Sequence, residues 1–350
     1  MRVLDQMGEQ SVEQQPLQQG RTTDDESTAL TPEIKDSTCQ KGDGAQGAER
    51  RGSELILPED ILYHIHALMP MRDAARAAGV SCGFRRSWEF YPKLILDIET
   101  LGINEDACNV NEITCDFISI VDHIMQNHSG IGVKIFRLRT NPCDNVHPSY
   151  VDRWLQGAII PGIEEFELQM PWHNKIEYNF PCSLLSTERG RSMQSFLLAD
   201  CAFHSAAEVG CLSNLMTVYL SSVHITGEEL RGFLSNCWAL ERLDLSNCSD
   251  IVRLKIPSLL SKLNFLQVQD CVMLETIESN VPNLSQFNYV GRPIHISFGD
   301  PAHLRHIRMM SLNESNMLYC ASTKLPSIAP NLQTLLLASQ DEVVNTPMVH

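Results

Sequence analysis

A short pattern of apolar positions recurs along the C-terminal two thirds of the chain. Each copy has an apolar residue, two others, an apolar residue, one other and a third apolar residue. The copies are Val133/Phe136/Leu138, Ile163/Phe166/Leu168, Met193/Phe196/Leu198, Leu215/Val218/Leu220, Leu240/Leu243/Leu245, Leu263/Leu266/Val268, Leu284/Phe287/Tyr289, Leu304/Ile307/Met309 and Leu332/Leu335/Leu337. They start roughly 20 to 30 residues apart, a spacing that allows one strand and one return segment per copy.

Self-similarity at this period is typical of a leucine-rich-repeat solenoid, in which each coil packs only on its neighbours. Three copies place a cysteine at the next fixed offset, namely Cys201, Cys248 and Cys271. We expect the chain to turn inward there, so that this small side chain can hydrogen-bond the backbone of the adjacent coil. The predicted fold class is therefore α/β, with a parallel β-sheet horseshoe or arc built from nine such coils.

The residues before the repeats fall into two segments. Residues 1–54 are rich in Gln, Glu, Asp, Ser, Thr and Gly and contain no aromatic residue, so we expect a disordered acidic tail. Residues 55–96 are more apolar, and residues 97–350 form the predicted repeats. No apolar run approaches the roughly 18 residues that span a membrane, and no signal-peptide pattern opens the chain. We therefore expect a cytoplasmic or nuclear protein that binds no membrane.

The segment before the repeats has the spacing of short helices. Pro58 suits a first helical turn, and apolar residues follow at Ile61, Leu62, Ile65 and Leu68. Pro70 interrupts this helix, and Asp73 is predicted to cap a second one. A third helix carries Phe84 and Trp88. Because three such helices have too small a core to be stable alone, part of their apolar surface is expected to contact a partner.

This segment resembles the F-box. The resemblance is carried by Leu57-Pro58-Glu59-Asp60-Ile61-Leu62, Leu68-Met69-Pro70-Met71-Arg72-Asp73, Val80-Ser81 and Trp88. With the repeats behind it, the chain resembles plant F-box/leucine-rich-repeat proteins of the grass type, which are related to the F-box/FBD/LRR family. In that family the F-box docks on a Skp-type adaptor, the adaptor joins a cullin, and the repeats hold a protein that is to be ubiquitinated.

The resemblance also implies which residues bind the adaptor. They are Leu57, Pro58, Ile61, Leu62, Ile65, Leu68, Pro70, Asp73, Val80, Phe84 and Trp88. Phe84 stands where many F-boxes carry a first tryptophan, so weaker adaptor binding is expected. The chain stops at His350, where members of the family commonly continue into an FBD-type region. We therefore expect the last coil to be uncapped.

Residues between the apolar strand positions are expected to point outward together, on the concave face of the solenoid. Candidates for target binding on this face are Glu165, Glu167, Tyr219, Arg242, Asp244, Phe265, Asn288, His306 and Arg308. Tyr219 and Phe265 are the expected anchors, since aromatic and Arg side chains carry most interface energy. The repeat region has 16 basic and 28 acidic residues. This balance repels nucleic acid and attracts basic segments of a protein.

No catalytic motif is present, since H-E-x-x-H, G-x-S-x-G and a glycine-rich phosphate loop are all absent. We expect no catalytic residue, no bound metal and no cofactor. The predicted function is a non-catalytic, substrate-recruiting subunit of an SCF-type cullin-RING ubiquitin ligase. Two alternatives stay open. The three helices could be a plain cap on the solenoid, and the chain could act as a stand-alone interaction scaffold or as a truncated decoy that binds the adaptor.

Overall fold

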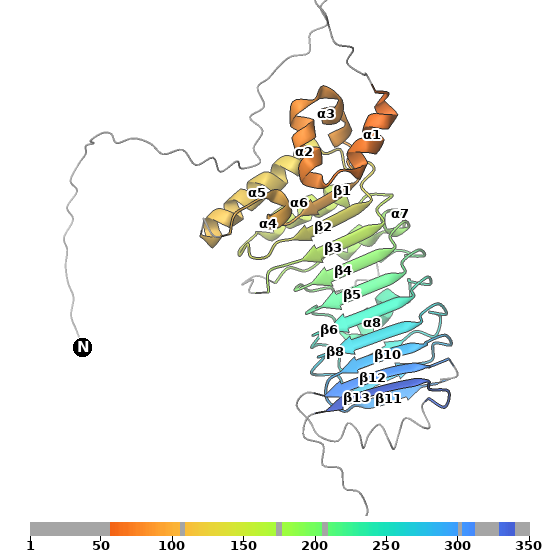
Figure 1. Ribbon diagram of the computed structural model, residues 1–350. Helices are drawn as coiled ribbons and strands as arrows, with labels where there is room; N and C mark the ends of the chain where they lie inside the picture. The colour runs from red at the N-terminus through yellow and green to blue at the C-terminus, as the bar shows by residue number, and fades with distance from the viewer. Residues whose placement is uncertain are drawn as a thin grey trace, which may run out of the picture.

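The computed structural model in Figure 1 describes residues 57–105, 109–172, 177–204, 209–299, 303–311 and 329–339. Three helices come first, and a long stack of parallel strands follows (Figure 1). The tail predicted at residues 1–54 lies outside the described residues. The α/β class and the parallel sheet predicted from the repeat pattern are confirmed.

The three N-terminal helices are α1 (Glu59–Leu68), α2 (Met71–Val80) and α3 (Cys82–Trp88). Pro58 and Pro70 precede α1 and α2, at positions where the missing N–H breaks no helical hydrogen bond. The predicted capping by Asp73 is wrong. Asp73 lies inside the first turn of α2, where its Oδ1 is 3.6 Å from Arg76 Nη1. A carboxylate in this turn still interacts favourably with the helix dipole.

Ten strands form one parallel sheet, and they lie side by side in the order in which they occur along the chain. They are β1 (Lys93–Leu96), β2 (Ile135–Arg139), β3 (Glu165–Gln169), β4 (Ser195–Ala199), β5 (Thr217–Ser221), β6 (Arg242–Ser246), β8 (Phe265–Gln269), β10 (Gln286–Val290), β12 (His306–Ser311) and β13 (Thr334–Ser339). The last nine are the copies of the apolar pattern, so the predicted repeats are confirmed. β1 is an additional strand, within the range predicted for the helical segment.

The apolar positions stack in register from coil to coil. Phe136 of β2 pairs with Phe166 of β3, which pairs with Phe196 of β4. Their rings stack with centroids 6.1 and 5.6 Å apart. Three further phenylalanines from the return segments pack around this stack, namely Phe180, Phe203 and Phe233. Burying each such side chain stabilises the fold by roughly 1.5–3 kcal/mol, so the aromatic stack is a main source of stability.

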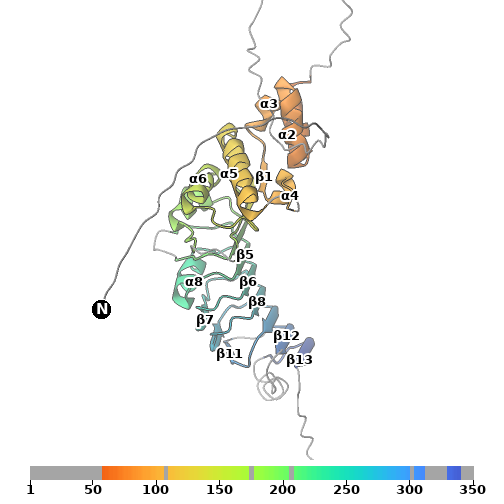
Figure 2. The same cartoon turned by 90° about the vertical axis from the view of Figure 1, so that its left-hand side faces the viewer.

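The return segments change character along the chain. Helices cover the early strands: α4 (Ile98–Leu101), α5 (Val110–Asn127), α6 (Pro148–Ala158), the 3-10 helix η1 (Cys182–Leu185), α7 (Thr187–Gly190) and α8 (Gly227–Leu234). Later return segments form a second parallel sheet from β7 (Arg253–Ile256), β9 (Thr276–Ser279) and β11 (His295–Phe298). Figure 2 shows α5, α6, α8 and the second sheet on one side of the ten-stranded sheet. Among the described elements, no helix lies over the other side of β2 to β13, which is called the open face below.

A left-handed residue ends four of the central strands. Asp200, Ser222, Asn247 and Asp270 follow β4, β5, β6 and β8 directly, with φ between 51° and 57°. Each backbone N–H donates to the last residue of the next strand, for example Asn247 N to Gln269 O at 2.9 Å. Polar residues such as Asn and Asp tolerate this conformation best among residues with a side chain. The turn therefore explains the recurrence of short polar residues directly before the cysteine offset.

The cysteines at this offset behave partly as predicted. The Cys248 thiol donates to Leu220 O of the preceding coil at 3.6 Å, which confirms the expected bond between coils. Cys271 instead donates to Gln269 O of its own coil at 3.6 Å, and its thiol contacts that of Cys248. The hydrogen bond between the two thiols and burial both raise the pKa of the Cys248 thiol. Burial also raises the pKa of Cys201, so these two thiols stay protonated and unreactive near neutral pH.

The three-helix unit covers the open edge of β1. Met71 Sδ accepts a hydrogen bond from Ile95 N at 3.2 Å. Met71, Ala74 and Ala78 of α2 are buried in the same core as Leu94 of β1. A cap for the solenoid, which the sequence left open as an alternative, is therefore one role of this unit.

Replacing Asn247 by Val should lower the free energy of unfolding by about 1–2 kcal/mol, because a β-branched residue is strained in the left-handed conformation. Asn247→Gly should be tolerated, since glycine has no Cβ. Asn247 is exposed, so neither change alters the core. Denaturant unfolding of the purified chain measures the difference. Equal midpoints for the two variants would contradict this account of the turn.

The thiol position gives a second test. Cys248→Leu should lower the free energy of unfolding by about 1–3 kcal/mol, because a larger side chain must enter a fully buried polar turn. Cys248→Asn should unfold close to the wild type, since the amide can donate to the same Leu220 carbonyl. Thermal unfolding of both variants measures this. If the leucine variant is as stable as the asparagine variant, the hydrogen bond between coils has no structural importance.

Candidate functional site

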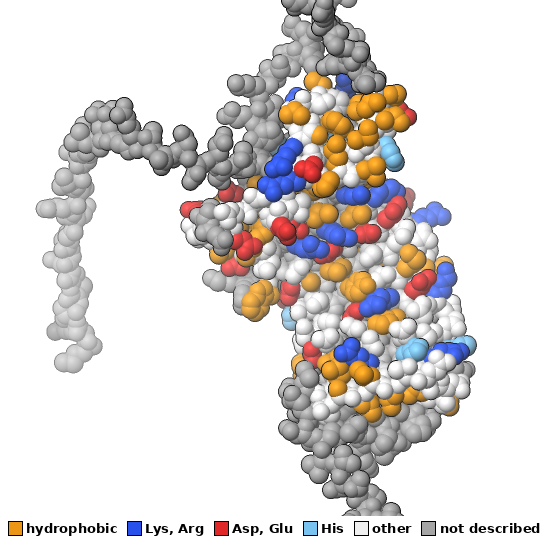
Figure 3. Space-filling model, in the orientation of Figure 1, with side chains coloured by type: hydrophobic (Ala, Val, Ile, Leu, Met, Phe, Trp, Pro, Cys, Tyr) orange, Lys and Arg blue, Asp and Glu red, His pale blue; other side chains and the backbone are white. Residues whose placement is uncertain are grey.

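Apolar side chains are exposed over the three-helix unit, and Figure 3 shows hydrophobic side chains gathered there. They are Leu57, Ile61, Leu68, Val80 and Phe90, with exposed fractions from 37% for Leu57 to 90% for Val80. The side of α2 that packs on β1 uses other residues. The cap role therefore accounts for the buried apolar residues of this unit and does not account for the exposed ones.

The predicted adaptor-binding residues divide by exposure. Seven are exposed: Leu57, Pro58, Ile61, Leu68, Pro70, Asp73 and Val80. Leu62, Ile65 and Phe84 are half-buried. Trp88 is buried, and its ring stacks on Tyr91 with centroids 5.3 Å apart, so it lies in the interior of the unit. Phe90, which follows α3 and is 41% exposed, was not predicted, although it directly follows the recognised segment.

His66 joins the three helices to one another. It lies in α1, is buried, and its Nε2 donates to Ala74 O of α2 at 2.9 Å. Its Nδ1 is 2.9 Å from Ser87 Oγ of α3, which donates the proton because Nε2 carries the ring hydrogen. The imidazole also lies 5.1 Å from the Phe84 ring. This side chain fixes the positions of the helices that present the exposed apolar residues.

A second buried histidine joins this unit to the first coil. His128 Nε2 donates to Tyr91 O at 2.8 Å, and its Nδ1 accepts from Gly130 N at 2.9 Å. Both ring nitrogens are thus used by the neutral imidazole. Burial lowers the pKa of His128 below its ordinary value, and the hydrogen bond to Tyr91 opposes this effect. His123, on the preceding helix α5 (Val110–Asn127), is exposed by contrast.

The open face of the ten-stranded sheet begins with a charged band. Arg139 of β2 holds Glu167 of β3 through two hydrogen bonds, Nε–Oε1 at 2.6 Å and Nη2–Oε2 at 3.1 Å. Its Nη1 lies 3.3 Å from Asp97 Oδ2. Arg137 pairs with Glu165 at 3.0 Å. The predicted target-binding residues Glu165 and Glu167 are therefore already paired with arginines that the prediction omitted, although both follow the same strand alternation.

Four other predicted residues lie together further along this face. The Arg242 guanidinium carbon lies 3.8 Å from the centroid of Phe265 and 5.6 Å from that of Tyr219. Arg242 Nη2 donates to Asp244 Oδ2 at 3.2 Å. Asp244 is buried, which raises its pKa, while the bond from Arg242 opposes that rise. Asn288, His306 and Arg308 follow on β10 and β12.

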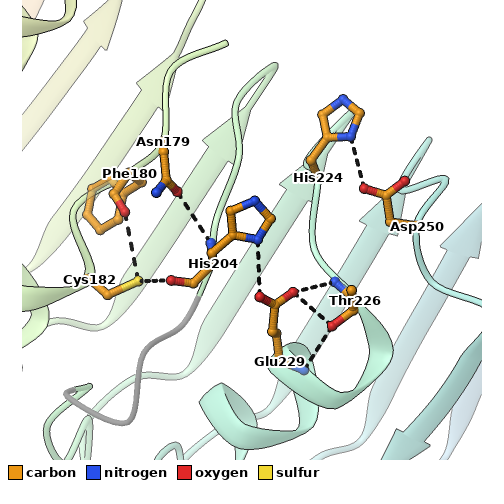
Figure 4. A network of polar contacts seen from close by, with 8 residues as sticks. All are labelled: Asn179, Phe180, Cys182, His204, His224, Thr226, Glu229 and Asp250. Carbon is orange, nitrogen blue, oxygen red and sulfur yellow. Dashed lines mark hydrogen bonds and ion pairs between the residues drawn. The ribbon is translucent and has the colours of Figure 1, made fainter.

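A polar network, not predicted from the sequence, links the loops that follow the central strands (Figure 4). His204 Nδ1 is 3.1 Å from Glu229 Oε1 of α8, and His224 Nδ1 is 2.9 Å from Asp250 Oδ2. Glu229 also accepts from Thr226 N at 2.8 Å in a capping box that begins α8. Thr226 and Glu229 have the spacing of this motif, which was the available sequence signal. The contacts join successive coils and bring no reactive group together.

The described residues contain no cluster of His, Cys, Asp or Glu with the geometry of a metal site. The nine cysteines in the described part of the chain form no disulfide. None of the helices that the structure describes is long and apolar enough to cross a membrane.

Comparison with known families identifies the repeats. Residues 124–350 match the profile of the family described as At1g61320/AtMIF1, LRR domain. The chain belongs to this leucine-rich-repeat family. The match begins within α5 and includes every strand of the ten-stranded sheet after β1.

Curated relatives from Arabidopsis thaliana add the F-box. The chain is 26% identical over 300 residues to F-box/LRR-repeat protein At4g14096, 26% over 242 residues to F-box/LRR-repeat protein At3g58900, and 24% over 196 residues to F-box/FBD/LRR-repeat protein At1g13570. These matches cover 81%, 67% and 56% of this chain. They cover 61%, 71% and 44% of the relatives, so the chain spans less than two thirds of the first and third.

Acidification should weaken the junction at His128. Because the pKa of His128 is lower in the folded chain than in the unfolded chain, its stabilising effect is fully present above about pH 6.5. This effect is lost as the pH falls from there toward the folded-state pKa. His128→Gln should therefore show a smaller loss of unfolding free energy between about pH 7.5 and about pH 5.5 than the wild type.

His123→Gln is the matched control, because His123 is exposed on the preceding helix α5. It should keep the wild-type pH dependence. If His128→Gln and His123→Gln change the pH dependence equally, the junction histidine is not responsible.

Proposed function

We propose that this chain is a non-catalytic, substrate-recruiting subunit of an SCF-type cullin-RING ubiquitin ligase. The three-helix unit binds a Skp-type adaptor, and the open face of the ten-stranded sheet binds the target protein. Support comes from relatives named F-box/LRR-repeat proteins and from the structure of the unit. Ubiquitin transfer is performed by other subunits, so the chain contributes proximity and orientation.

The observation that carries the proposal is that the three-helix unit has two apolar sides, one buried against the solenoid and one exposed. α2 buries Met71, Ala74 and Ala78 against the solenoid, as a cap requires. Ile61 and Leu68 of α1 remain 42% and 68% exposed. Large apolar side chains exposed together mark an interaction site rather than a solvated surface. A cap alone leaves these residues unexplained, whereas a docked adaptor would bury them.

Function in the cytoplasm or nucleus is part of this proposal, because the cullin-based ligases act there. The open sheet face supports target binding by its form. α5, α6, α8 and the second sheet lie on one side of the ten strands, and no described helix lies over the other side of β2 to β13 (Figure 2). The stand-alone scaffold remains the alternative, and adaptor binding separates the two.

The double variant Ile61→Asp/Leu68→Asp should bind a purified plant Skp-type adaptor at least about tenfold more weakly than the wild type. The reason is that two apolar contacts become carboxylates that docking would desolvate without a partner. Titration calorimetry measures the affinity. Circular dichroism and thermal unfolding should match the wild type, because both side chains are exposed.

The control is Val272→Asp/Met273→Asp, which places the same two charges at apolar residues that are 63% and 55% exposed in the turn after β8. It should bind the adaptor normally. Wild-type affinity of the α1 double variant would show that this surface is not the docking site. Absence of adaptor binding by the wild-type chain would favour the scaffold.

A further inference from the structure

The open sheet face differs in charge from the repeat region as a whole. Its outward positions carry basic Lys93, Arg137, Arg139, Arg242 and Arg308 against acidic Glu165, Glu167 and Asp244. The acidic excess of the repeats lies elsewhere, for example at exposed Glu228, Glu241 and Glu275. The expectation of a basic target was drawn from net charge, and the charges on this face do not support it.

The basic residues of this face fall into two groups. Arg137 and Arg139 are neutralised by Glu165, Glu167 and Asp97 in the charged band. Beyond β5, the outward strand positions carry only one carboxylate, that of Asp244, and it is buried. In Figure 3 the lower strands accordingly show basic and histidine side chains with few acidic ones. Outside the charged band, the basic residues of this face are Lys93 on β1 and the arginines of β6 and β12.

Arg242 is held in place with hydrogen-bonding capacity to spare. Phe265 and Tyr219 flank its guanidinium, and Asp244 binds only Nη2. Its Nε is buried and has no hydrogen-bond partner among the described residues, so a ligand could reach only the terminal nitrogens of the guanidinium. The side chain is 38% exposed. A guanidinium fixed between aromatic rings loses little entropy on binding, and its planar group suits a carboxylate.

Arg242 is paired with the buried Asp244, whereas Arg308 on β12 has no carboxylate partner among the described residues. It is exposed, and its Nε and Nη2 lie 3.2 and 3.1 Å from Met310 Sδ, a weak acceptor. No carboxylate of the described residues forms an ion pair with it. The strands between the two arginines carry neutral amides, where Asn288 Nδ2 donates to Gln267 Oε1 at 3.3 Å in the row that joins Asp244 to Arg308. This arrangement provides two cationic ends and a polar, uncharged middle.

The spacing of the arginines fits an extended chain. β6 and β12 are separated by β8 and β10, so three strand steps of about 4.8 Å place the two strands roughly 14 Å apart. Arg242 is in register with His306, and Arg308 lies two residues further along β12, so the two arginines are roughly 16 Å apart. An extended segment rises about 3.4 Å per residue, and its side chains alternate between two faces. Acidic residues four positions apart would therefore point to the same side with about the same separation.

We propose that the face of β6 to β12 binds an acidic, extended segment of the target protein, with Arg242 and Arg308 each binding a carboxylate. The inference rests on the proposed function, in that the ligand belongs to the recruited target. The acidic, extended character of the ligand is inferred from the arginines and amides of this face. Gln267 and Asn288 would hydrogen-bond the backbone between the two acidic side chains.

Selection from a display library of random peptides on the immobilised full chain tests this directly. Peptides with Asp or Glu four positions apart should be enriched, and added salt should weaken their binding. For the strongest peptide made synthetically, Arg242→Gln and Arg308→Gln should each weaken binding about tenfold, as should Glu→Gln changes in the peptide. Arg253→Gln on β7 is the matched control, because it removes the same charge from the opposite sheet.

Enrichment of Lys and Arg, no enrichment, or unchanged affinity in both arginine variants would overturn the inference. Arg308 is exposed, so its variant remains informative if Arg242→Gln unfolds. The α1 double variant Ile61→Asp/Leu68→Asp should retain peptide binding. A chain that binds the adaptor and selects no acidic peptide contradicts this inference alone, whereas one that selects acidic peptides without binding the adaptor contradicts the proposed function alone.

Discussion

In-register stacking of each coil on the next is the interaction on which every surface of this protein depends. The inward positions pair strand to strand, from Leu94 and Phe136 at one end to Ile307 and Leu335 at the other. A shift by one residue would turn the apolar set outward. Because the register is kept across all ten strands, the outward side chains form continuous rows, and the charged band and the Arg242 cluster are consequences of it.

The three-helix unit ends this stack and at the same time extends the protein toward a partner. α2 covers β1, and the buried imidazoles of His66 and His128 join the helices to one another and to the first coil. A unit joined in this way has a fixed orientation to the sheet. An adaptor docked on α1 would therefore lie in a defined position relative to a target on the sheet, as recruitment for ubiquitin transfer requires.

The repeats could be predicted closely from the sequence because their signal is local and periodic. All nine copies became strands, and the α1 apolar positions fell on one helix. The predicted capping by Asp73 was wrong because α2 begins directly after Pro70, which leaves Asp73 inside the first turn. The second sheet was missed because its strands have only four residues each, too few to distinguish them from the rest of a return segment. The pairing of Glu165 and Glu167 with arginines depends on which residues lie opposite them on the neighbouring strand. The charge of the open face depends on which face each carboxylate lies on, and amino-acid composition gives no information about that.

Hydrogen exchange of the full chain, with and without a purified Skp-type adaptor, most directly tests whether the three-helix unit uses one side as a cap and the other for docking. The account predicts slower exchange on adaptor binding in α1 and α3, with unchanged exchange in β2 through β13. No change in the three helices, or protection confined to the ten-stranded sheet, would contradict it.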